Sequence, residues 1–261
     1  MSVVIKSSAE IAAMQEAGRL NAEVRSLLRA AIRPGVTGRE LDELAKREIS
    51  HRGATPTFVG YAPGAHPPYP GAICFSVNEQ LVHGIPGDRV LKEGDIVSID
   101  LGVTYRGWVS DAAFTAGVGE IAPEAAQLLR VTEEALRAGI EAAHAGAYLG
   151  DVSYAIGQRA QGYGIIEEYG GHGVGRQMHE APHILNKGRR GTGIRLKPGM
   201  VLALEPMLAI GHPATVEEED GWTVSMRDGS LSAHFEETIA ITEGVPLVLT
   251  RIADPVAGRA G

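Results

Sequence analysis

A ten-residue string occurs twice in this 261-residue chain, and this internal repeat limits the folds that the chain can adopt. Leu91-Lys-Glu-Gly-Asp-Ile-Val-Ser-Ile-Asp100 matches Leu196-Lys-Pro-Gly-Met-Val-Leu-Ala-Leu-Glu205, and both strings end on an acid. Upstream, His83-Gly-Ile-Pro86 resembles His179-Glu-Ala-Pro182. Chance similarity between short apolar strings is the alternative, but the shared Leu-Lys-x-Gly and the shared acid favour a repeat. We therefore expect two halves related by a pseudo-twofold axis, each delivering an acid from a strand end and a histidine before it.

Four helices are indicated by local start and stop signals. Capping boxes at Ser7 and Thr37, each with a glutamate three residues later, are typical of helix N-termini. Pro34-Gly35 stops the first helix, and Pro123 suits the first turn of the third. The expected helices run over residues 7–32, 37–51, 123–143 and 151–162.

The remaining segments have the patterns of loops and strands. Residues 56–71 carry five prolines, so we expect a shaped loop there. Apolar alternation predicts strands over 72–118 and again after Gly162, with Asp228-Gly229 as a hairpin turn. Separate runs of helix and strand favour an α+β fold over alternating βαβ units, in a single catalytic domain over residues 1–261.

Composition excludes several classes of protein. With 44% hydrophobic and 21% charged residues, the chain is of an ordinary globular type with a sizeable core. The formal net charge of −8 disfavours a nucleic-acid binder, so we expect no DNA partner. The chain has one cysteine, Cys74, so no intramolecular disulfide can form, which fits a reducing cytoplasm. We expect Cys74 to be an apolar wall residue rather than a nucleophile. The N-terminus lacks a signal-peptide pattern and no apolar stretch reaches membrane-spanning length, so we expect a cytoplasmic protein without a membrane partner.

Two aspartates flank a predicted hairpin. Asp100 follows the apolar residues 96–99, and Asp111 begins the next strand. If the hairpin centres near Tyr105-Arg106, the two aspartates face each other with Cβ atoms roughly 4.5–5.5 Å apart. Bare carboxylates would repel one another there, whereas a pair of divalent ions would turn the repulsion into coordination. Exposed loop acids are the alternative, which the preceding apolar strand disfavours.

Further carboxylates show the same pattern. Glu205 closes the apolar run 200–204, where a buried carboxylate is costly unless it is paired or binds a metal. Glu236 and Glu237 adjoin on a predicted strand, so their side chains point to opposite faces and only one can enter a site. Strand parity leaves the choice between them open.

Histidines add an imidazole ligand and acid–base candidates. His172 lies in the glycine-rich segment 170–175, whose glycines allow a close approach to a ligand or metal; the following residues do not form the helix that a phosphate loop needs. The segment 179–183 formally matches H-E-x-x-H, but Pro182 disfavours the helix that this zinc motif requires, so we reject it. His179 and His83 remain acid–base or hydrogen-bond candidates, with a purely structural histidine as the alternative.

These residues, in this order, resemble the type I methionine aminopeptidases of the pita-bread (creatinase/aminopeptidase) fold. That resemblance implies an antiparallel sheet flanked by helices, in two halves related by a pseudo-twofold axis. It covers nearly the whole chain and rests on Asn78-Glu-Gln-Leu-Val-His83-Gly-Ile-Pro86, Ser98-Ile-Asp100-Leu-Gly102, Ser110-Asp111, Gly171-His172-Gly173-Val-Gly175, Met178-His179-Glu180-Ala-Pro182, Leu204-Glu205-Pro206-Met207 and Phe235-Glu236-Glu237-Thr238.

Residue roles follow from the resemblance. It implies that His83 and His179 contact the scissile region of the substrate, and it selects Glu236 over Glu237. The chain departs from many relatives in a longer insertion over 62–68, so His66 is not expected to replace a pocket tyrosine. Met178 stands where an aromatic residue is common, which predicts a softer pocket. The implied metal ligands are Asp100, Asp111, His172, Glu205 and Glu236, and the implied methionine pocket is formed by Tyr69, Cys74, Met178 and Trp222.

The implied activity is removal of the initiator methionine from nascent polypeptides with a small second residue. Two divalent ions (Co, Mn, Fe(II) or Zn) would hold a bridging hydroxide that attacks the first peptide carbonyl. Glu205 would take its proton, His179 would stabilise the oxyanion and His83 would contact the amide. An X-Pro-cleaving relative is the alternative enzyme, disfavoured because its N-terminal domain is missing from the sequence. A metal-free binding module is the alternative outside enzymes, and it predicts broken ligands, whereas all five are present.

The first predicted helix carries a recurring arginine. Arg25, Arg29 and Arg33 are spaced four residues apart, and such a stripe could dock on ribosomal RNA. A solvated helix face is the favoured interpretation, because charged faces are common. We expect a monomer whose partners are the N-termini of nascent polypeptides, with transient ribosome contact as the further hypothesis.

Overall fold

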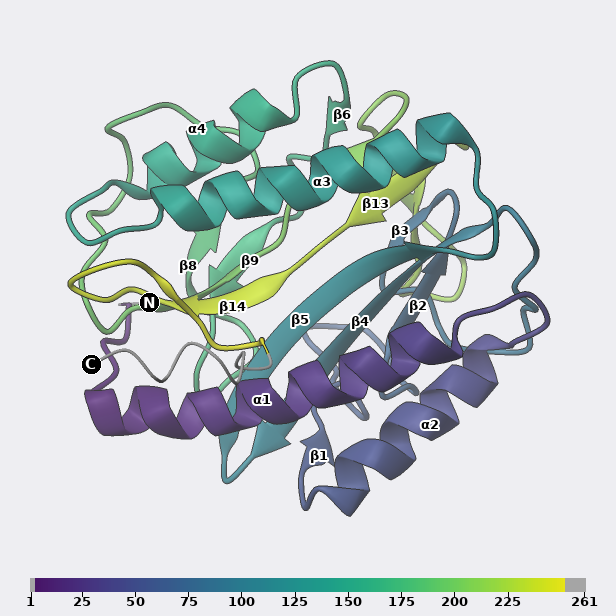
Figure 1. Cartoon of the computed structure of the whole chain (residues 1–261), viewed down its shortest axis with the longest axis horizontal. Coiled ribbons are helices and arrows are strands. Elements are labelled where there is room, and N and C mark those ends of the chain that lie inside the picture. Colours follow the sequence, from purple (N-terminus) through teal and green to yellow (C-terminus); the bar gives the residue numbers. More distant parts are fainter. Residues whose placement is uncertain (1–2, 252–261) are drawn as a thin grey trace, which may run out of the picture.

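Four helices lie on one side of the strands in the computed structural model, which describes residues 3–251 (Figure 1). They are α1 (Ser8–Ala31), α2 (Gly38–His51), α3 (Pro123–Ala142) and α4 (Leu149–Arg159). Both predicted capping boxes are present, with side chain and backbone bonded reciprocally at Ser7 and Thr37. Helix α4 begins two residues before the expected start, because the Asp151 carboxylate accepts a 2.7 Å hydrogen bond from the backbone N–H of Tyr148 and so occupies the third helical position.

The strands are short except for one long hairpin. Their bounds are β1 (Thr55–Pro56), β2 (Cys74–Val77), β3 (Gln80–Val82), β4 (Ile96–Tyr105), β5 (Trp108–Gly117), β6 (Gly164–Ile165), β7 (Gly171–Gly173), β8 (Glu180–Ile184), β9 (Val201–Leu204), β10 (Met207–Ala209), β11 (Thr215–Glu217), β12 (Val224–Met226), β13 (Ser232–His234), β14 (Glu237–Ala240) and β15 (Leu247–Val248). Of the predicted loop 56–71, only Pro56 joins a strand, at the edge of the sheet beside Val103.

Two antiparallel sheets build the centre of the molecule. One contains β1, β4, β2 and β5, and the other has the order β15-β14-β9-β7-β8. Their junction lies between β5 and the residue before β14, where Ala113 and Glu236 exchange backbone hydrogen bonds of 3.2 and 3.0 Å. In Figure 1, α1 and α2 cover β4 and β5, and α3 and α4 cover the other half. The α+β architecture expected from the sequence is confirmed.

The internal repeat extends to backbone hydrogen bonds in both halves. Leu91 bonds to the turn before α2, with its N–H donating to Val36 O at 2.8 Å, and Leu196 bonds to the turn before α4, with its N–H donating to Ala147 O at 2.8 Å. The two glycines of the repeat donate equivalently, Gly94 to Val118 O and Gly199 to Ile241 O, both at 2.9 Å. Each copy therefore joins the loop before its second helix to a pair of antiparallel strands in the same way, β4–β5 in one half and β9–β14 in the other.

The β4–β5 hairpin has a different register from the predicted one. Its turn is Arg106-Gly107, with φ values of 50° and 75°, so Asp100 lies opposite Ala113 and Asp111 lies opposite Gly102. A two-residue turn of this kind needs positive φ at both positions, and glycine meets that need at the second. The aspartates are therefore diagonal neighbours on one face rather than a directly opposed pair. Asp100 also lies inside a long strand and not at its end.

The predicted hairpin turn at Asp228-Gly229 is wrong. Strand β12 pairs with β11 and β3, whereas β13 pairs with β10. The Asp228 carboxylate accepts backbone N–H groups of His212 at 2.7 Å and Ser230 at 3.0 Å. These bonds tie the turn to the segment after β10 and lead the chain into a second sheet.

Candidate metal centre

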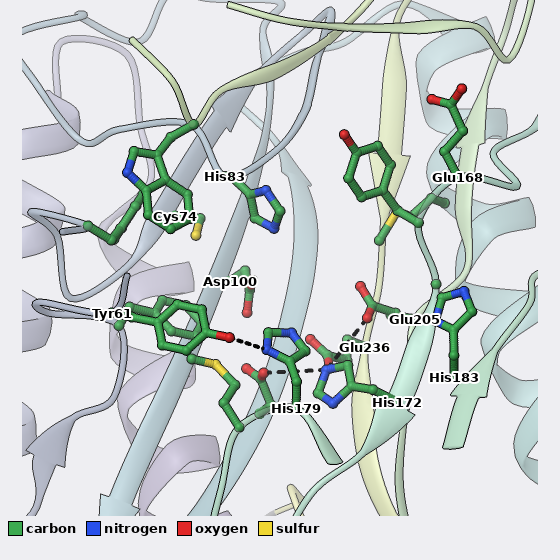
Figure 2. A pocket seen from close by; sticks show the side chains of 18 residues that line it. Tyr61, Cys74, His83, Asp100, Glu168, His172, His179, His183, Glu205 and Glu236 are labelled. Atoms are coloured by element: carbon green, nitrogen blue, oxygen red, sulfur yellow. Dashed lines mark hydrogen bonds and ion pairs between the residues drawn. The ribbon is translucent and has the colours of Figure 1, made fainter. Parts of the chain in front are cut away.

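One cavity of about 240 Å³ is lined by every side chain that the sequence singled out for ligation, catalysis or methionine binding (Figure 2). Its empty space lies between the two halves. The eleven predicted residues that line it are Tyr69, Cys74, His83, Asp100, Asp111, His172, Met178, His179, Glu205, Trp222 and Glu236.

Neighbouring strands present the carboxylates and the imidazole. His172 on β7 lies beside Ala203 on β9, and Glu205 directly follows β9. Glu236 precedes β14, whose Glu237 lies opposite Leu204. From the other sheet, β4 and β5 contribute the two aspartates. All five therefore come from backbone that is fixed by strand pairing.

His172 is close to three of the carboxylates. Its Nε2 lies 3.6 Å from Glu205 Oε1, 3.8 Å from Asp111 Oδ2 and 3.8 Å from Glu236 Oε1. Ligand atoms that share one ion at about 2.0–2.2 Å stand roughly 3–4 Å from each other, so these separations match a common centre. The His172 Nδ1 lies 3.0 Å from Gly173 O, a carbonyl that can only accept. The proton is therefore on Nδ1, and the Nε2 lone pair faces the carboxylates.

Two groups of ligand atoms share one glutamate. Asp111, His172 and Glu236 offer atoms that lie within 4.8 Å of one another, and so do Asp100, His234 and Glu236. The second group includes a histidine that the sequence analysis missed, although a residue two positions before Glu236 lies on the same strand face by simple alternation. His234 is 2% exposed, and in the described part of the chain its Nδ1 has no hydrogen-bond partner.

The carboxylates fit a divalent cation. Buried oxygens of Asp100, Asp111 and Glu236 have no hydrogen-bond partner among the described residues. Burial raises the pKa of Asp111 to about 7, and burial together with the neighbouring carboxylates raises the pKa values of Asp100 and Glu236 well above their usual range. Burial, followed by the charge of Asp111, does the same to the pKa of Glu205. Cations would balance this buried negative charge and supply the absent partners.

The structure distinguishes the two adjacent glutamates. Glu236 lines the cavity, whereas Glu237 pairs with Arg25 at 3.0 Å. This pair also bears on the predicted arginine stripe. Arg25 is turned inward to Glu237, and the Arg29 guanidinium lies 4.2 Å above the Phe114 ring. The three arginines therefore do not form one continuous solvated row.

The predicted non-helical geometry of the H-E-x-x-H string is confirmed. Glu180–Ile184 forms strand β8, and His183 lies opposite His172 on β7. His179 lies just before this strand, and its ring centroid is 4.3 Å from that of His172. His179 is exposed at the cavity mouth, and partial desolvation by the cavity wall lowers its pKa, which favours the neutral imidazole.

An apolar compartment adjoins the acidic cluster. Tyr69, Cys74, Met178 and Trp222 belong to one cluster of buried side chains, and the Tyr69 and Trp222 rings meet edge to face at 5.1 Å. Burial raises the pKa of the Cys74 thiol well above its usual value, so Cys74 is a neutral wall residue. His66 lies outside the cavity lining and stacks on Trp222 at 5.0 Å, so it does not replace a pocket tyrosine.

Sequence analysis also missed other residues of the cavity wall. Tyr61 comes from the proline-rich loop, where no periodicity points to a facing direction. Glu168 and Tyr169 precede the glycine-rich segment, and His183 was set aside together with the rejected zinc motif. Phe58 and Met207 complete the set of missed lining residues that carry side-chain bulk.

The fold and the cavity together define a class of protein, a metal-dependent hydrolase. This chain belongs to metallopeptidase family M24, whose family model matches residues 12–243.

Relatives with full-length similarity share one description. A methionine aminopeptidase of Aquifex aeolicus is 45% identical over 260 residues, which span 97% of this chain and 100% of that protein. Methionine aminopeptidase 1 of Bacillus subtilis is 46% identical, over 96% of this chain and 100% of the relative. The crystal structure of a methionine aminopeptidase from Thermotoga maritima superposes with a TM-score of 0.93 at 43% identity, over 96% of this chain and 100% of that one.

More distant structures show the fold alone. A prolidase from Pyrococcus furiosus matches 96% of this chain and 66% of its own, with a TM-score of 0.75 at 24% identity. The expected pita-bread fold is thereby confirmed. Among residues 3–251, no helix combines the length and the apolar character that a bilayer crossing requires.

Proposed function

We propose that this protein removes N-terminal methionine from polypeptides, with two divalent ions held in the acidic cluster. The observation that carries the proposal is the convergence of His172 Nε2 and three carboxylates within 3.8 Å, beside an apolar pocket. Relatives of 45–46% identity that are called methionine aminopeptidases point to the same activity.

The shared glutamate suggests how the ligands divide. Asp111, His172 and Glu236, with Glu205 beside them, would hold one ion, and Asp100 and Glu236, with His234 in the same group, would hold the second. Oxygen-rich sites with one imidazole suit Mn, Fe(II), Co or Zn. Bound ions would supply a water of lowered pKa and a Lewis acid for the scissile carbonyl.

The remaining chemistry belongs to side chains of this protein. Glu205 has 13% of its side chain exposed, against 5% for Asp111 and 2% for Glu236, and would be the carboxylate that receives a proton from water in the cavity. His179 would donate a hydrogen bond to the oxyanion that develops on the first carbonyl. In Figure 2, His83 lies on the other side of Asp100 from His179. Desolvation lowers the pKa of His83 to about 4, so it would meet the substrate amide as a neutral imidazole.

Specificity would come from the apolar compartment. A methionine side chain is unbranched and apolar, so Tyr69, Cys74, Met178 and Trp222 can hold it largely by burial. The carbonyl must reach the acids, which brings the second residue of the substrate close to the same wall. The resemblance to methionine aminopeptidases implies that this space is tight, so we expect a preference for a small second residue and the N-termini of nascent chains as substrates.

Peptide hydrolysis by protein purified without oxygen tests the proposal. Samples loaded separately with Mn, Fe(II), Co or Zn should cleave a Met-Ala peptide and spare a Met-Lys peptide, with two ions bound per chain. Cleavage of an Ala-Pro peptide in place of Met-Ala would instead support the alternative hypothesis, an X-Pro-cleaving enzyme. Absence of hydrolysis with every metal, despite full loading, would reject the aminopeptidase function.

A further inference from the structure

Two neighbouring histidines in the cavity are hydrogen-bonded in opposite ways. We propose that Tyr61 is a positioning residue that holds His179 in the tautomer with the proton on Nε2, ready to donate to the substrate. This inference rests on the role of His179 in the proposed function. No catalytic step is assigned to Tyr61 itself.

The contact is direct. Tyr61 Oη lies 2.8 Å from His179 Nδ1, with the ring centroids 5.7 Å apart and the planes tilted by 38° (Figure 2). Between a phenol and a neutral imidazole, the phenol is the stronger acid and the unprotonated ring nitrogen is the stronger acceptor. Tyr61 therefore donates its O–H to Nδ1. An imidazole that accepts at Nδ1 carries its single proton on Nε2.

His172 provides the contrast. Its Nδ1 faces the Gly173 carbonyl, which can only accept, so His172 keeps the proton on Nδ1 and offers a lone pair at Nε2. The two rings lie 4.3 Å apart between centroids. One Nε2 is thus a metal-type acceptor and the other a donor, and the difference is set by what each Nδ1 meets.

The proline-rich loop fixes the position of Tyr61. Two backbone bonds bracket this residue, from the Tyr61 N–H to Phe58 O at 2.9 Å and from the Tyr69 N–H to Tyr61 O at 2.8 Å. Farther along the loop, Pro67 O accepts a 3.0 Å bond from Trp222 Nε1. The N–H and the C=O of Tyr61 are therefore both held by hydrogen bonds within the loop, and the bond from Tyr69 ties back the insertion 62–68. Tyr61 presents its hydroxyl to His179 from this fixed backbone.

Removal of one hydroxyl tests the proposal in kinetics. Tyr61→Phe keeps the ring and should lower kcat for a Met-Ala peptide about 10- to 100-fold, as loss of an orienting partner commonly does, with a smaller change in KM and unchanged metal content. Tyr163→Phe is the matched control, because Tyr163 packs in a separate apolar cluster outside the cavity lining. A change in KM alone would mean that Tyr61 only shapes the pocket, and would overturn the proposal.

The tautomer itself can be observed by NMR. Long-range 1H–15N spectra of zinc-loaded full-length protein, labelled at histidine and assigned with His179→Gln, should show His179 with an unprotonated Nδ1 and a protonated Nε2. In Tyr61→Phe the Nδ1-protonated form should appear. A protonated Nδ1 in the unsubstituted protein, or identical spectra for both proteins, would refute the assignment. This readout does not depend on turnover, so failure of the aminopeptidase activity would be seen separately in the peptide assay.

Discussion

At the residue scale, Asp111 is the carboxylate with the most constrained surroundings. Its backbone N–H donates to Thr238 Oγ1 at 3.1 Å, and the same hydroxyl donates back to Asp111 O at 2.7 Å. The residue is 4% exposed, and its Oδ1 has no hydrogen-bond partner within residues 3–251. The backbone is thus held from β14 while the carboxylate is left free to bind an ion.

Asp111→Asn should abolish peptide hydrolysis and lower the bound metal while the protein remains folded. An amide oxygen carries no charge and binds divalent ions weakly, yet it has almost the same shape as the carboxylate. Metal analysis and circular dichroism measure the two effects. Asp151→Asn on α4, remote from the cavity, should retain both metal and activity. Full metal content with normal turnover in Asp111→Asn would contradict the ligand assignment.

His179→Ala should separate catalysis from ligation. Loss of a single oxyanion donor commonly lowers kcat by roughly 10²–10³, and His179 has no close contact with a carboxylate among the ion pairs of the described residues. Metal content should therefore be unchanged. If the variant loses metal, His179 is a ligand rather than a donor to the substrate.

The residues of the site were predictable from sequence where local patterns carry direction. An acid after an apolar strand, as at Glu205, and alternation along a strand are such patterns. Strand alternation also identifies His234, once Glu236 is known to face the cavity, because the two residues are two positions apart. Tyr61 could not be found in this way, because its loop has no regular dihedral repeat and its direction depends on Phe58, Tyr69 and Trp222.

At the element scale, helices with capping boxes were predicted to within about one residue because their signals are local. The sequence did not predict the role of either turn correctly. The position of the Arg106-Gly107 turn depends on backbone twist, and the course of the chain at Asp228-Gly229 depends on a carboxylate that binds a distant segment. The segment before α1 depends on distant contacts too. Lys6 is 4% exposed, and its Nζ lies 2.7 Å from Glu180 Oε2, beside His179.

Lys6→Met should destabilise the fold by about 2–3 kcal/mol, because it leaves the Glu180 carboxylate partly buried without a cation. Its other oxygen already accepts the backbone N–H groups of Arg176 and Gln177 and cannot turn to solvent freely. Urea unfolding measures the change. Lys187→Met, which removes an exposed pair with Glu167, should have little effect. Equal stability of the two variants would show that the Lys6 pair contributes no more than a surface contact.

At the scale of the whole molecule, the acidic cluster couples stability to pH. Buried carboxylates with raised pKa values bind more protons in the folded chain than in the unfolded chain. Their contribution to the free energy of unfolding therefore falls as pH rises, until the pH passes the pKa of the folded state. Half-buried His83 and buried His172 and His234, with pKa values lowered to about 4, 3 and 3, act in the opposite direction below their ordinary value of 6.5. Above about pH 7 these histidines are largely neutral in both states, so the carboxylates and the Cys74 thiol, whose pKa burial also raises, govern the pH dependence.

Protein treated with a chelator should therefore lose thermal stability between pH 7 and pH 9. Burial raises the pKa of Asp111 to about 7, so this carboxyl loses its proton at the start of the window, and burial also raises the pKa values of Asp100, Glu205 and Glu236 well above their usual range. Protein loaded with Mn should show a smaller decrease in Tm, because bound cations keep the carboxylates ionised. A chelated sample with the same Tm at both pH values would show that repulsion between the ionised carboxylates of the cluster does not destabilise the fold.

The hydrogen bonds between Ala113 and Glu236 have a consequence for how this protein can change over generations. The first repeat supplies two of the acids, and the second supplies the imidazole and the other two. Only together do the halves bring Asp100 and Asp111 to the ligand atoms around Glu236. A substitution that displaces one half by a fraction of an ångström must be matched in the other, so the two copies are free to diverge in sequence but remain bound to a common geometry.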